Sequence, residues 1–143
     1  MAKKYELPTF LAEAVSAATY ERWLRRKAQT HVFRDRKRGN RTAIGEAYRI
    51  AIHAAVIQSQ GRDAYTGEML DWKLISIYNN LKSKKEGRKY KHSFALLPTV
   101  DHVGDGSGPA TFRICGWRTN DAKHDLELPE FLALCRAVLK HNG

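Results

Sequence analysis

The chain has 143 residues, of which 43% are hydrophobic, and a formal net charge of +10 at pH 7. This length predicts one domain with a modest core, and no apolar run approaches the ~20 residues that a membrane span needs. The excess of Lys and Arg favours a polyanionic partner: DNA, RNA or an anionic membrane surface. Cys115 and Cys135 are too few for a disulfide framework or an all-cysteine zinc site, and both are predicted to be buried thiols. Because residues 1–4 are not followed by an apolar signal segment, we expect a cytoplasmic protein.

The N-terminal half is predicted to consist of helices. A short helix over 8–16 precedes a longer one, which Thr19 caps and Gly39 ends. A third helix extends from a cap at Thr42 to a stop at Gly61. A turn over 64–68 and a helix capped by Asp71 follow, and the polar, basic segment 83–92 is predicted to be a loop. The aromatic residues at helical spacing are expected in the core: Trp23, Tyr48, Trp72 and Tyr78.

The C-terminal half is predicted to contain two strands and two helices. The strands cover 93–100 and 110–116, and a Gly-rich loop over 104–109 joins them. Thr119 is expected to cap a helix that begins near Asn120, and Pro129 begins a last helix whose apolar side faces a core. Two strands are not stable alone and must pack on helices. The predicted fold class is therefore α+β, a helix-rich single domain around a two-stranded antiparallel unit.

Four polar residues near the strands and the following helix suit phosphodiester hydrolysis. Asp101 and His102 are adjacent at a strand end, so their side chains point to opposite sides, which suits catalysis if Asp101 faces the helix and His102 faces the substrate. Asn120 and His124 are four positions apart and share one helix face. Carboxylate and amide oxygens suit Mg²⁺, which takes few ligands from the protein, and an imidazole suits proton transfer near neutral pH. The pattern predicts one divalent metal beside one general base.

Three segments resemble the HNH, or ββα-metal (His-Me finger), endonucleases: Val100-Asp-His-Val103, the Gly-rich loop, and Trp117-Arg-Thr-Asn-Asp-Ala-Lys-His-Asp-Leu126. The resemblance covers residues 63–126. It implies a ββα-metal motif in which His102 is the general base and Asp101 and Asn120 hold Mg²⁺ or Mn²⁺. His124 falls on the position of a second helix-borne metal ligand in colicin-like members. Asn120 and Lys123 match the Asn-x-x-Lys pattern of many members.

The chain departs from the family pattern in two places. The Asn that braces the general base through its carbonyl is expected nine positions before Asn120, where this sequence has Thr111. Many members also bind structural zinc through two Cys-x-x-Cys knuckles. The equivalents here are the segment 63–67 and Gly116 with Thr119, which carry no cysteine. We therefore expect no structural zinc, and packing in its place.

Basic residues gather in two parts of the sequence, over 22–41 and over 82–91. They are expected to contact nucleic-acid phosphates without reading the base sequence. The candidate residues are Arg34, Arg36, Lys37, Arg38, Lys84, Lys85 and Lys123. A solvated side chain is the alternative for each of them. The distribution predicts a basic helical part over 1–62 and a nuclease core over 63–143, which together form one compact domain.

Together, the residues and the resemblance predict a metal-dependent HNH endonuclease that hydrolyses DNA, of the bacterial or phage kind. The alternative is a non-catalytic nucleic-acid-binding protein that keeps the HNH fold, and Thr111 favours it. RNA is a less favoured substrate, and no membrane partner is expected. A purely structural interpretation remains for each site residue: a turn pair for Asp101 and His102, a helix start for Asn120, and a solvated helix position for His124.

Overall fold

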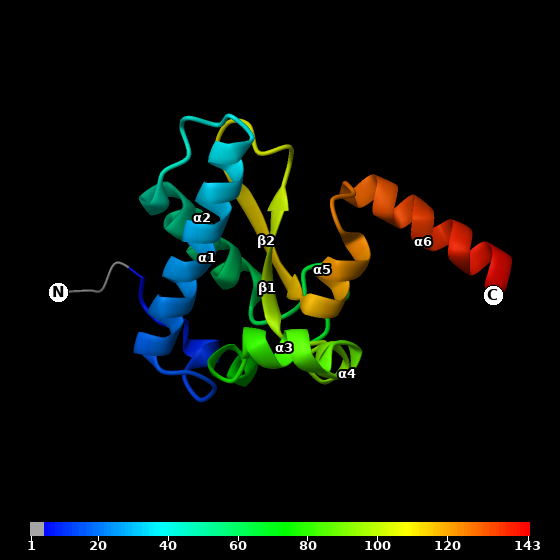
Figure 1. Cartoon of the computed structure of the whole chain (residues 1–143), viewed down its shortest axis with the longest axis horizontal. Coiled ribbons are helices and arrows are strands. Elements are labelled where there is room, and N and C mark those ends of the chain that lie inside the picture. Colours follow the sequence, from blue (N-terminus) through cyan, green and yellow to red (C-terminus); the bar gives the residue numbers. More distant parts are fainter. Residues whose placement is uncertain (1–4) are drawn as a thin grey trace.

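A two-stranded antiparallel sheet lies at the centre of the structure, a computed structural model that describes residues 5–143 (Figure 1). The strands are β1 (Pro98–Val103) and β2 (Thr111–Gly116), and His102 pairs with Phe112. Helices surround the sheet, so the predicted helix-rich α+β class is confirmed. Our expectation that the chain has no signal segment rested partly on residues 1–4, which lie outside the described residues. Among those described, no helix is both long and apolar enough to cross a membrane.

Two long helices cover one side of the hairpin. They are α1 (Ala17–Lys37) and α2 (Gly45–Ser59), which pack on each other, and α2 also packs on β2 (Figure 1). The core that they form with the sheet buries Trp23, Tyr48 and Trp72, as predicted. Tyr78 is 36% exposed, so its assignment to the core is wrong. One hydrophobic core therefore extends across both predicted parts of the chain.

The predicted N-caps of both long helices are wrong by a few residues. Ser16 caps α1, because its Oγ accepts the Thr19 backbone N–H at 3.1 Å. Thr42 instead donates its backbone N–H and its hydroxyl to Asn40 Oδ1, at 2.9 Å and 2.6 Å, so α2 begins later, at Gly45. The predicted C-terminal ends of the two helices are nearly correct: α1 stops before Gly39, and α2 stops just before Gln60 and Gly61.

The segment between α2 and the hairpin differs most from prediction. A 3-10 helix, η2 (Trp72–Ser76), replaces the longer helix expected there, and a shorter one, η1 (Thr9–Leu11), replaces the helix expected over 8–16. The expected loop over 83–92 is instead α3 (Asn80–Glu86) and α4 (Arg88–Ser93). Asn79 starts α3, since its Oδ1 accepts the backbone N–H groups of Leu81 and Lys82. Lys and Glu are also good helix formers, so a basic composition does not exclude a helix.

Both elements that carry the site residues are displaced from their expected bounds. Because α4 occupies Ser93, β1 begins only at Pro98, and Asp101 and His102 lie inside the strand rather than after it. Helix α5 (Trp117–Lys123) follows β2 directly, so Thr119 is inside the helix and does not cap it. Consecutive β1, β2 and α5 thus form one strand–strand–helix unit.

The last helix, α6 (Leu128–Asn142), projects away from the body of the molecule (Figure 1). None of its residues is buried, and Leu139 is 70% exposed. The prediction that its apolar side faces a core is therefore wrong, because the described part of the chain provides nothing to cover it. Cys135 of this helix is exposed, also against prediction, whereas Cys115 of β2 is buried as expected.

Candidate functional site

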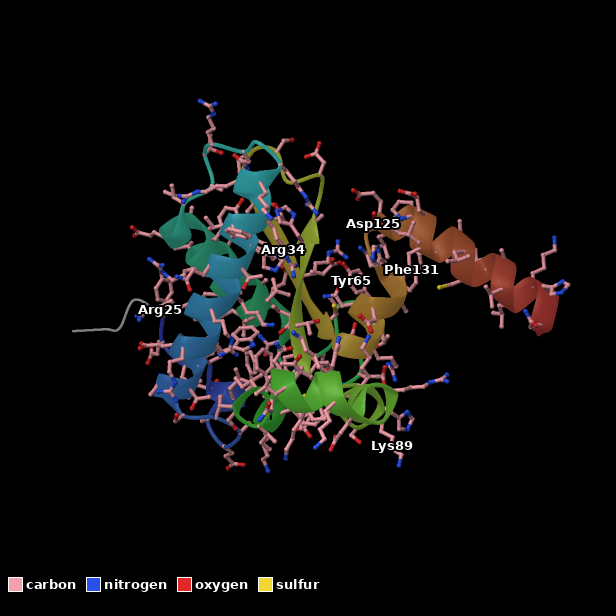
Figure 2. The ribbon with its side chains drawn as sticks, viewed as in Figure 1. Arg25, Arg34, Tyr65, Lys89, Asp125 and Phe131 are labelled. Carbon is pink, nitrogen blue, oxygen red and sulfur yellow. The ribbon has the colours of Figure 1, made fainter. Side chains whose placement is uncertain are left out.

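A cleft of about 930 Å³ opens between α1, the hairpin and α5. Asp101, His102 and Asn120 all line it. Its basic lining residues are Arg26, Lys27, Arg34, Arg38, Arg113 and Lys123. Figure 2 places Arg34 on the side of α1 that faces the hairpin and Arg25 on the outer side. The sequence-predicted acid, imidazole and amide therefore share one cleft, whose lining also includes the acidic residues Asp35, Asp121, Asp125 and Glu127.

Asp101 faces α5, on the opposite side of the strand from His102. The residue is 6% exposed, and its Oδ2 lies 3.1 Å from Nζ of Lys123, which is itself 5% exposed. The same oxygen accepts a hydrogen bond from the Tyr65 hydroxyl. Burial, together with this hydrogen bond to a carboxylate, raises the pKa of Tyr65 well above its usual value. Asp101 is thus a buried carboxylate with one cationic and one neutral donor.

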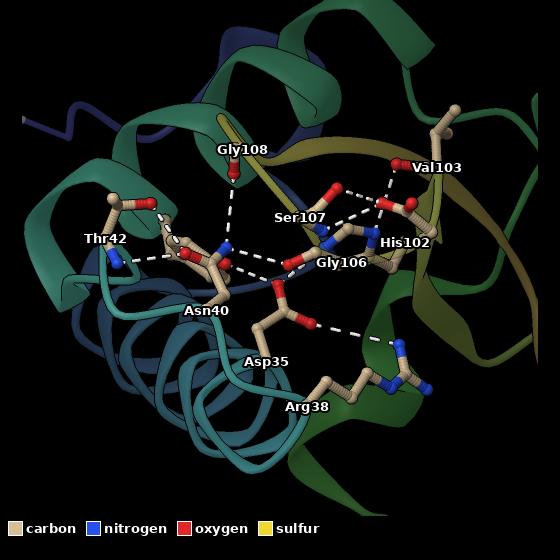
Figure 3. Close-up of polar contacts among 11 residues, drawn as sticks. Asp35, Arg38, Asn40, Thr42, His102, Val103, Gly106, Ser107 and Gly108 are labelled. Carbon is tan, nitrogen blue, oxygen red and sulfur yellow. Dashed lines mark hydrogen bonds and ion pairs between the residues drawn. The ribbon is translucent and has the colours of Figure 1, made fainter.

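His102 faces the opposite way, toward α1 (Figure 3). Its Nε2 lies 2.8 Å from Oδ2 of Asp35, and its Nδ1 lies 3.1 Å from the backbone oxygen of Val103. Asp35 is fully buried, at 1% exposure of the side chain, whereas the His102 side chain keeps 13%. The Tyr48 hydroxyl donates to the same Asp35 oxygen. A carboxylate distant in sequence therefore holds the predicted general base.

Asn120 lies in α5 on the wall opposite α1. Its Nδ2 donates to the Thr99 hydroxyl at 3.4 Å, and that hydroxyl donates to the backbone oxygen of Cys115 at 2.8 Å. The amide nitrogen is therefore directed toward β1. The amide oxygen has no protein hydrogen-bond donor among the described residues, and it remains the group that suits a hard cation.

The other two predicted site residues make none of these contacts, although His124 also lines the cleft. His124 is not on the helix, because α5 ends at Lys123 and His124 adopts a φ of 53° as its C-cap. Its side chain is 81% exposed, and its Nδ1 contacts only the neighbouring Asp125, at 3.1 Å. Thr111 is exposed at the start of β2, where it pairs with Val103 and not with His102. Asp35, and not Thr111, is the residue whose side chain contacts His102.

The predicted phosphate contacts divide into two groups. Arg34, Arg38 and Lys123 line the cleft. Arg36 and Lys37 do not, since Nε of Arg36 donates to the Ala43 carbonyl at 3.0 Å and Nζ of Lys37 lies 5.1 Å from the Phe33 ring centroid. Lys84 and Lys85 are exposed on α3, outside the cleft lining.

Two further titratable groups of α1 line the cleft. Burial, and then the charges of Arg26 and Arg34, lower the pKa of Lys27 to about 8. Burial, and then the charge of Arg34, lower the pKa of His31 to about 4. His31 is therefore neutral near pH 7, and its ring centroid lies 6.0 Å from that of His102. Burial is the main cause of both shifts, and the neighbouring arginines add to it.

The positions equivalent to the zinc knuckles are joined by hydrogen bonds to one buried carboxylate. Asp63 is 2% exposed, and its Oδ2 accepts from the Gly116 backbone N–H at 2.9 Å and the Thr119 hydroxyl at 2.7 Å. Its Oδ1 accepts the backbone N–H groups of Tyr65 and Thr66. Hydrogen bonds to Asp63 hold this turn against the start of α5. Tyr65 is thereby placed next to Asp101.

Sequence reasoning missed Asp35, Tyr65 and Asp63. A signal existed for Asp35, which is the only acidic residue between Arg22 and Arg41. A lone carboxylate inside such a run is a candidate for a specific partner. Comparisons of the chain with protein-family models, with curated proteins and with solved structures returned no match. A function for the cleft therefore has to be inferred from its own residues.

Proposed function

We propose that the cleft binds DNA and hydrolyses its phosphodiester bonds with a histidine general base and one divalent metal ion, in the manner of an HNH endonuclease. The observation that carries this proposal is the convergence of Asp101, His102 and Asn120 on one cleft, in which Arg34 and Arg38 also lie. The consecutive β1, β2 and α5 match the ββα order that the sequence resemblance implies. The net charge of +10 agrees with a polyanionic substrate.

The chemistry of the donor set fits Mg²⁺ or Mn²⁺. Asp101 and Asn120 offer a carboxylate and an amide oxygen on neighbouring elements, and Mg²⁺ takes most of its other ligands from water and phosphate. These two residues would hold the ion. When bound, it supplies neutralisation of charge on the phosphoryl oxygens and on the leaving oxygen.

His102 accepts a proton from the attacking water. The oxygen of that water forms the new bond to phosphorus while the bond to the 3′ oxygen breaks. The 3′ oxygen takes a proton from solvent, and His102 returns its own proton to solvent afterwards. The product strand therefore carries a 5′ phosphate. Arg34 and Arg38, both in the cleft lining, hold neighbouring phosphates by charge.

One observation favours a second candidate, a non-catalytic nucleic-acid-binding protein. The Asp101 carboxylate already has a cationic partner, because Lys123 Nζ lies 3.1 Å from its Oδ2. A metal ion has to use the other oxygen of Asp101 or displace the ammonium group. If the ion pair persists with DNA bound, the cleft holds a nucleic acid without cutting it.

Nicking of supercoiled plasmid separates the two candidates. The wild-type protein is incubated with Mg²⁺, with Mn²⁺ and with chelator, and His102→Ala serves as the matched control. We expect the wild-type protein to nick the plasmid only when a metal ion is present. The nicking rate of His102→Ala should be lower on the order of a hundredfold or more, while both proteins still bind DNA. DNA binding without nicking in either metal overturns the enzyme and supports the second candidate. Equal nicking by His102→Ala removes His102 from the chemistry.

A further inference from the structure

Asp35 lies at the base of the cleft, beneath a turn of the hairpin loop (Figure 3). Its Oδ2 is 2.8 Å from His102 Nε2, across 67 positions of sequence. Gly106 covers the other oxygen so closely that a Cβ at this glycine would lie 2.9 Å from Oδ1. Asn40 Nδ2 holds the turn in place through the carbonyls of Gly106, at 2.8 Å, and Gly108, at 3.2 Å. The Asp35–His102 contact is therefore enclosed on the carboxylate side.

Packing alone does not account for this carboxylate. Asp35 Oδ1 is buried and has no hydrogen-bond partner among the described residues, and the Arg38 guanidinium is 3.9 Å away. A buried charged oxygen without a donor destabilises a fold, so an apolar side chain would serve the core better. The one feature that an apolar residue could not reproduce is an acceptor for the Nε2 proton of His102 and for the Tyr48 hydroxyl.

The contact determines which ring nitrogen is basic. A carboxylate only accepts hydrogen bonds when ionised, so a neutral His102 must carry its proton on Nε2, facing Asp35. The lone pair is then on Nδ1. Val103 O, 3.1 Å from Nδ1, becomes a hydrogen-bond acceptor only after Nδ1 has gained a proton. Both ring nitrogens of His102 therefore face an oxygen acceptor, Asp35 Oδ2 at Nε2 and Val103 O at Nδ1.

We propose that Asp35 is a positioning residue: it orients the His102 ring and holds it as the Nε2–H tautomer. This inference rests on the proposed nuclease function for its catalytic consequence. The tautomer itself does not depend on that function. Asp35 contacts neither of the proposed metal ligands, and besides His102 its side chain meets Tyr48 and Arg38.

The test uses full-length Asp35→Leu, which removes the acceptor at similar volume, and Asp35→Asn, which keeps an oxygen but removes the charge. Nitrogen-15 NMR of the His102 ring in the free protein reports the tautomer without any substrate. We expect wild-type His102 to be fixed as Nε2–H and Asp35→Leu to show a mixture of tautomers. Arg38→Gln, which keeps the acceptor, is the matched control and should leave the tautomer unchanged.

Kinetics then measure the catalytic consequence. We expect kcat for plasmid nicking to fall on the order of a hundredfold in Asp35→Leu, with KM nearly unchanged, because a misdirected base affects the chemical step and not DNA binding. Asp35→Asn should fall between this variant and wild type. A wild-type tautomer of Nδ1–H, or one that Asp35→Leu does not alter, overturns the proposal. If the tautomer responds as expected but no protein nicks DNA, the nuclease function fails and the positioning role of Asp35 stands.

Discussion

Lys123 and Asp101 form an ion pair inside the protein, with Nζ 3.1 Å from Oδ2 and both residues at least 94% buried. We predict that Lys123→Met lowers the free energy of unfolding by about 3–5 kcal/mol, because it leaves a buried carboxylate without its counter-charge. Urea denaturation measures this change. Lys91→Met is the matched control, since Lys91 pairs with Asp121 at 2.8 Å but both side chains are about half exposed. That variant should lose less than about 1 kcal/mol. Equal losses in the two variants would show that burial of the Lys123 pair has no energetic consequence.

Asn120→Ala is predicted to increase the Mg²⁺ concentration needed for half-maximal nicking, because it removes one of the two proposed oxygen ligands. A metal titration of the nicking rate measures the shift. The control is Thr99→Val, since the amide of Asn120 also donates to the Thr99 hydroxyl at 3.4 Å. If Thr99→Val reproduces the shift, Asn120 acts by supporting β1. An unchanged titration in Asn120→Ala removes it from the ligand set.

The basic residues of α1 allow a paired comparison. The double variant Arg34→Gln/Arg38→Gln changes two side chains of the cleft lining. The double variant Arg36→Gln/Lys37→Gln changes two side chains outside it. Each double variant removes two positive charges. We predict that the first pair weakens binding of all duplex sequences alike. The log–log salt dependence should flatten by about 0.9 for each phosphate that the variant no longer neutralises. The second pair should have little effect. Equal effects of the two pairs would mean that net charge, and not the cleft, determines binding.

His31 is predicted to make the protein acid-labile. Its pKa is lowered to about 4 in the fold, mainly by burial, while an unperturbed histidine titrates near 6.5. Between these values the unfolded chain binds a proton that the folded protein does not, so stability falls as the pH decreases from 6.5 to 4. The loss is about 3 kcal/mol at pH 4. His31→Phe keeps a ring against Phe112 but cannot bind a proton. Between pH 7 and pH 4, the free energy of unfolding of this variant should therefore fall by about 3 kcal/mol less than that of the wild type. An identical pH profile in both proteins would contradict a neutral His31.

The parts of the site that follow from local pattern were predictable. Alternation along a strand directs Asp101 and His102 to opposite sides, and this remains true although β1 begins later than expected. Strand β2 and a helix carrying Asn120 were expected from turn residues and periodicity, and both are present. The buried aromatic residues Trp23 and Trp72 followed from helical spacing.

The contacts that complete the site could not be read from local pattern. Asp35 meets His102 across 67 positions, and Asp63 meets Thr119 across 56. No periodicity encodes such pairs, because they depend on how α1 and the turn after α2 pack on the hairpin. The error at α3 was different in kind: Asn79 is a good cap, but our prediction did not use it and followed the polar composition of the segment. For α6, the amphipathic pattern identifies an apolar side without stating what covers it.

The contact between Asp35 and His102 has a consequence for how this protein can be divided. We expected a basic binding part over 1–62 and a nuclease core over 63–143. Yet α1 belongs to the first part and supplies the acceptor for the histidine of the second. The two halves are therefore not interchangeable modules. A recombinant in which another basic segment replaced residues 1–62 would keep the hairpin sequence and lose the orientation of its imidazole, unless the new segment also brought a carboxylate to the same place.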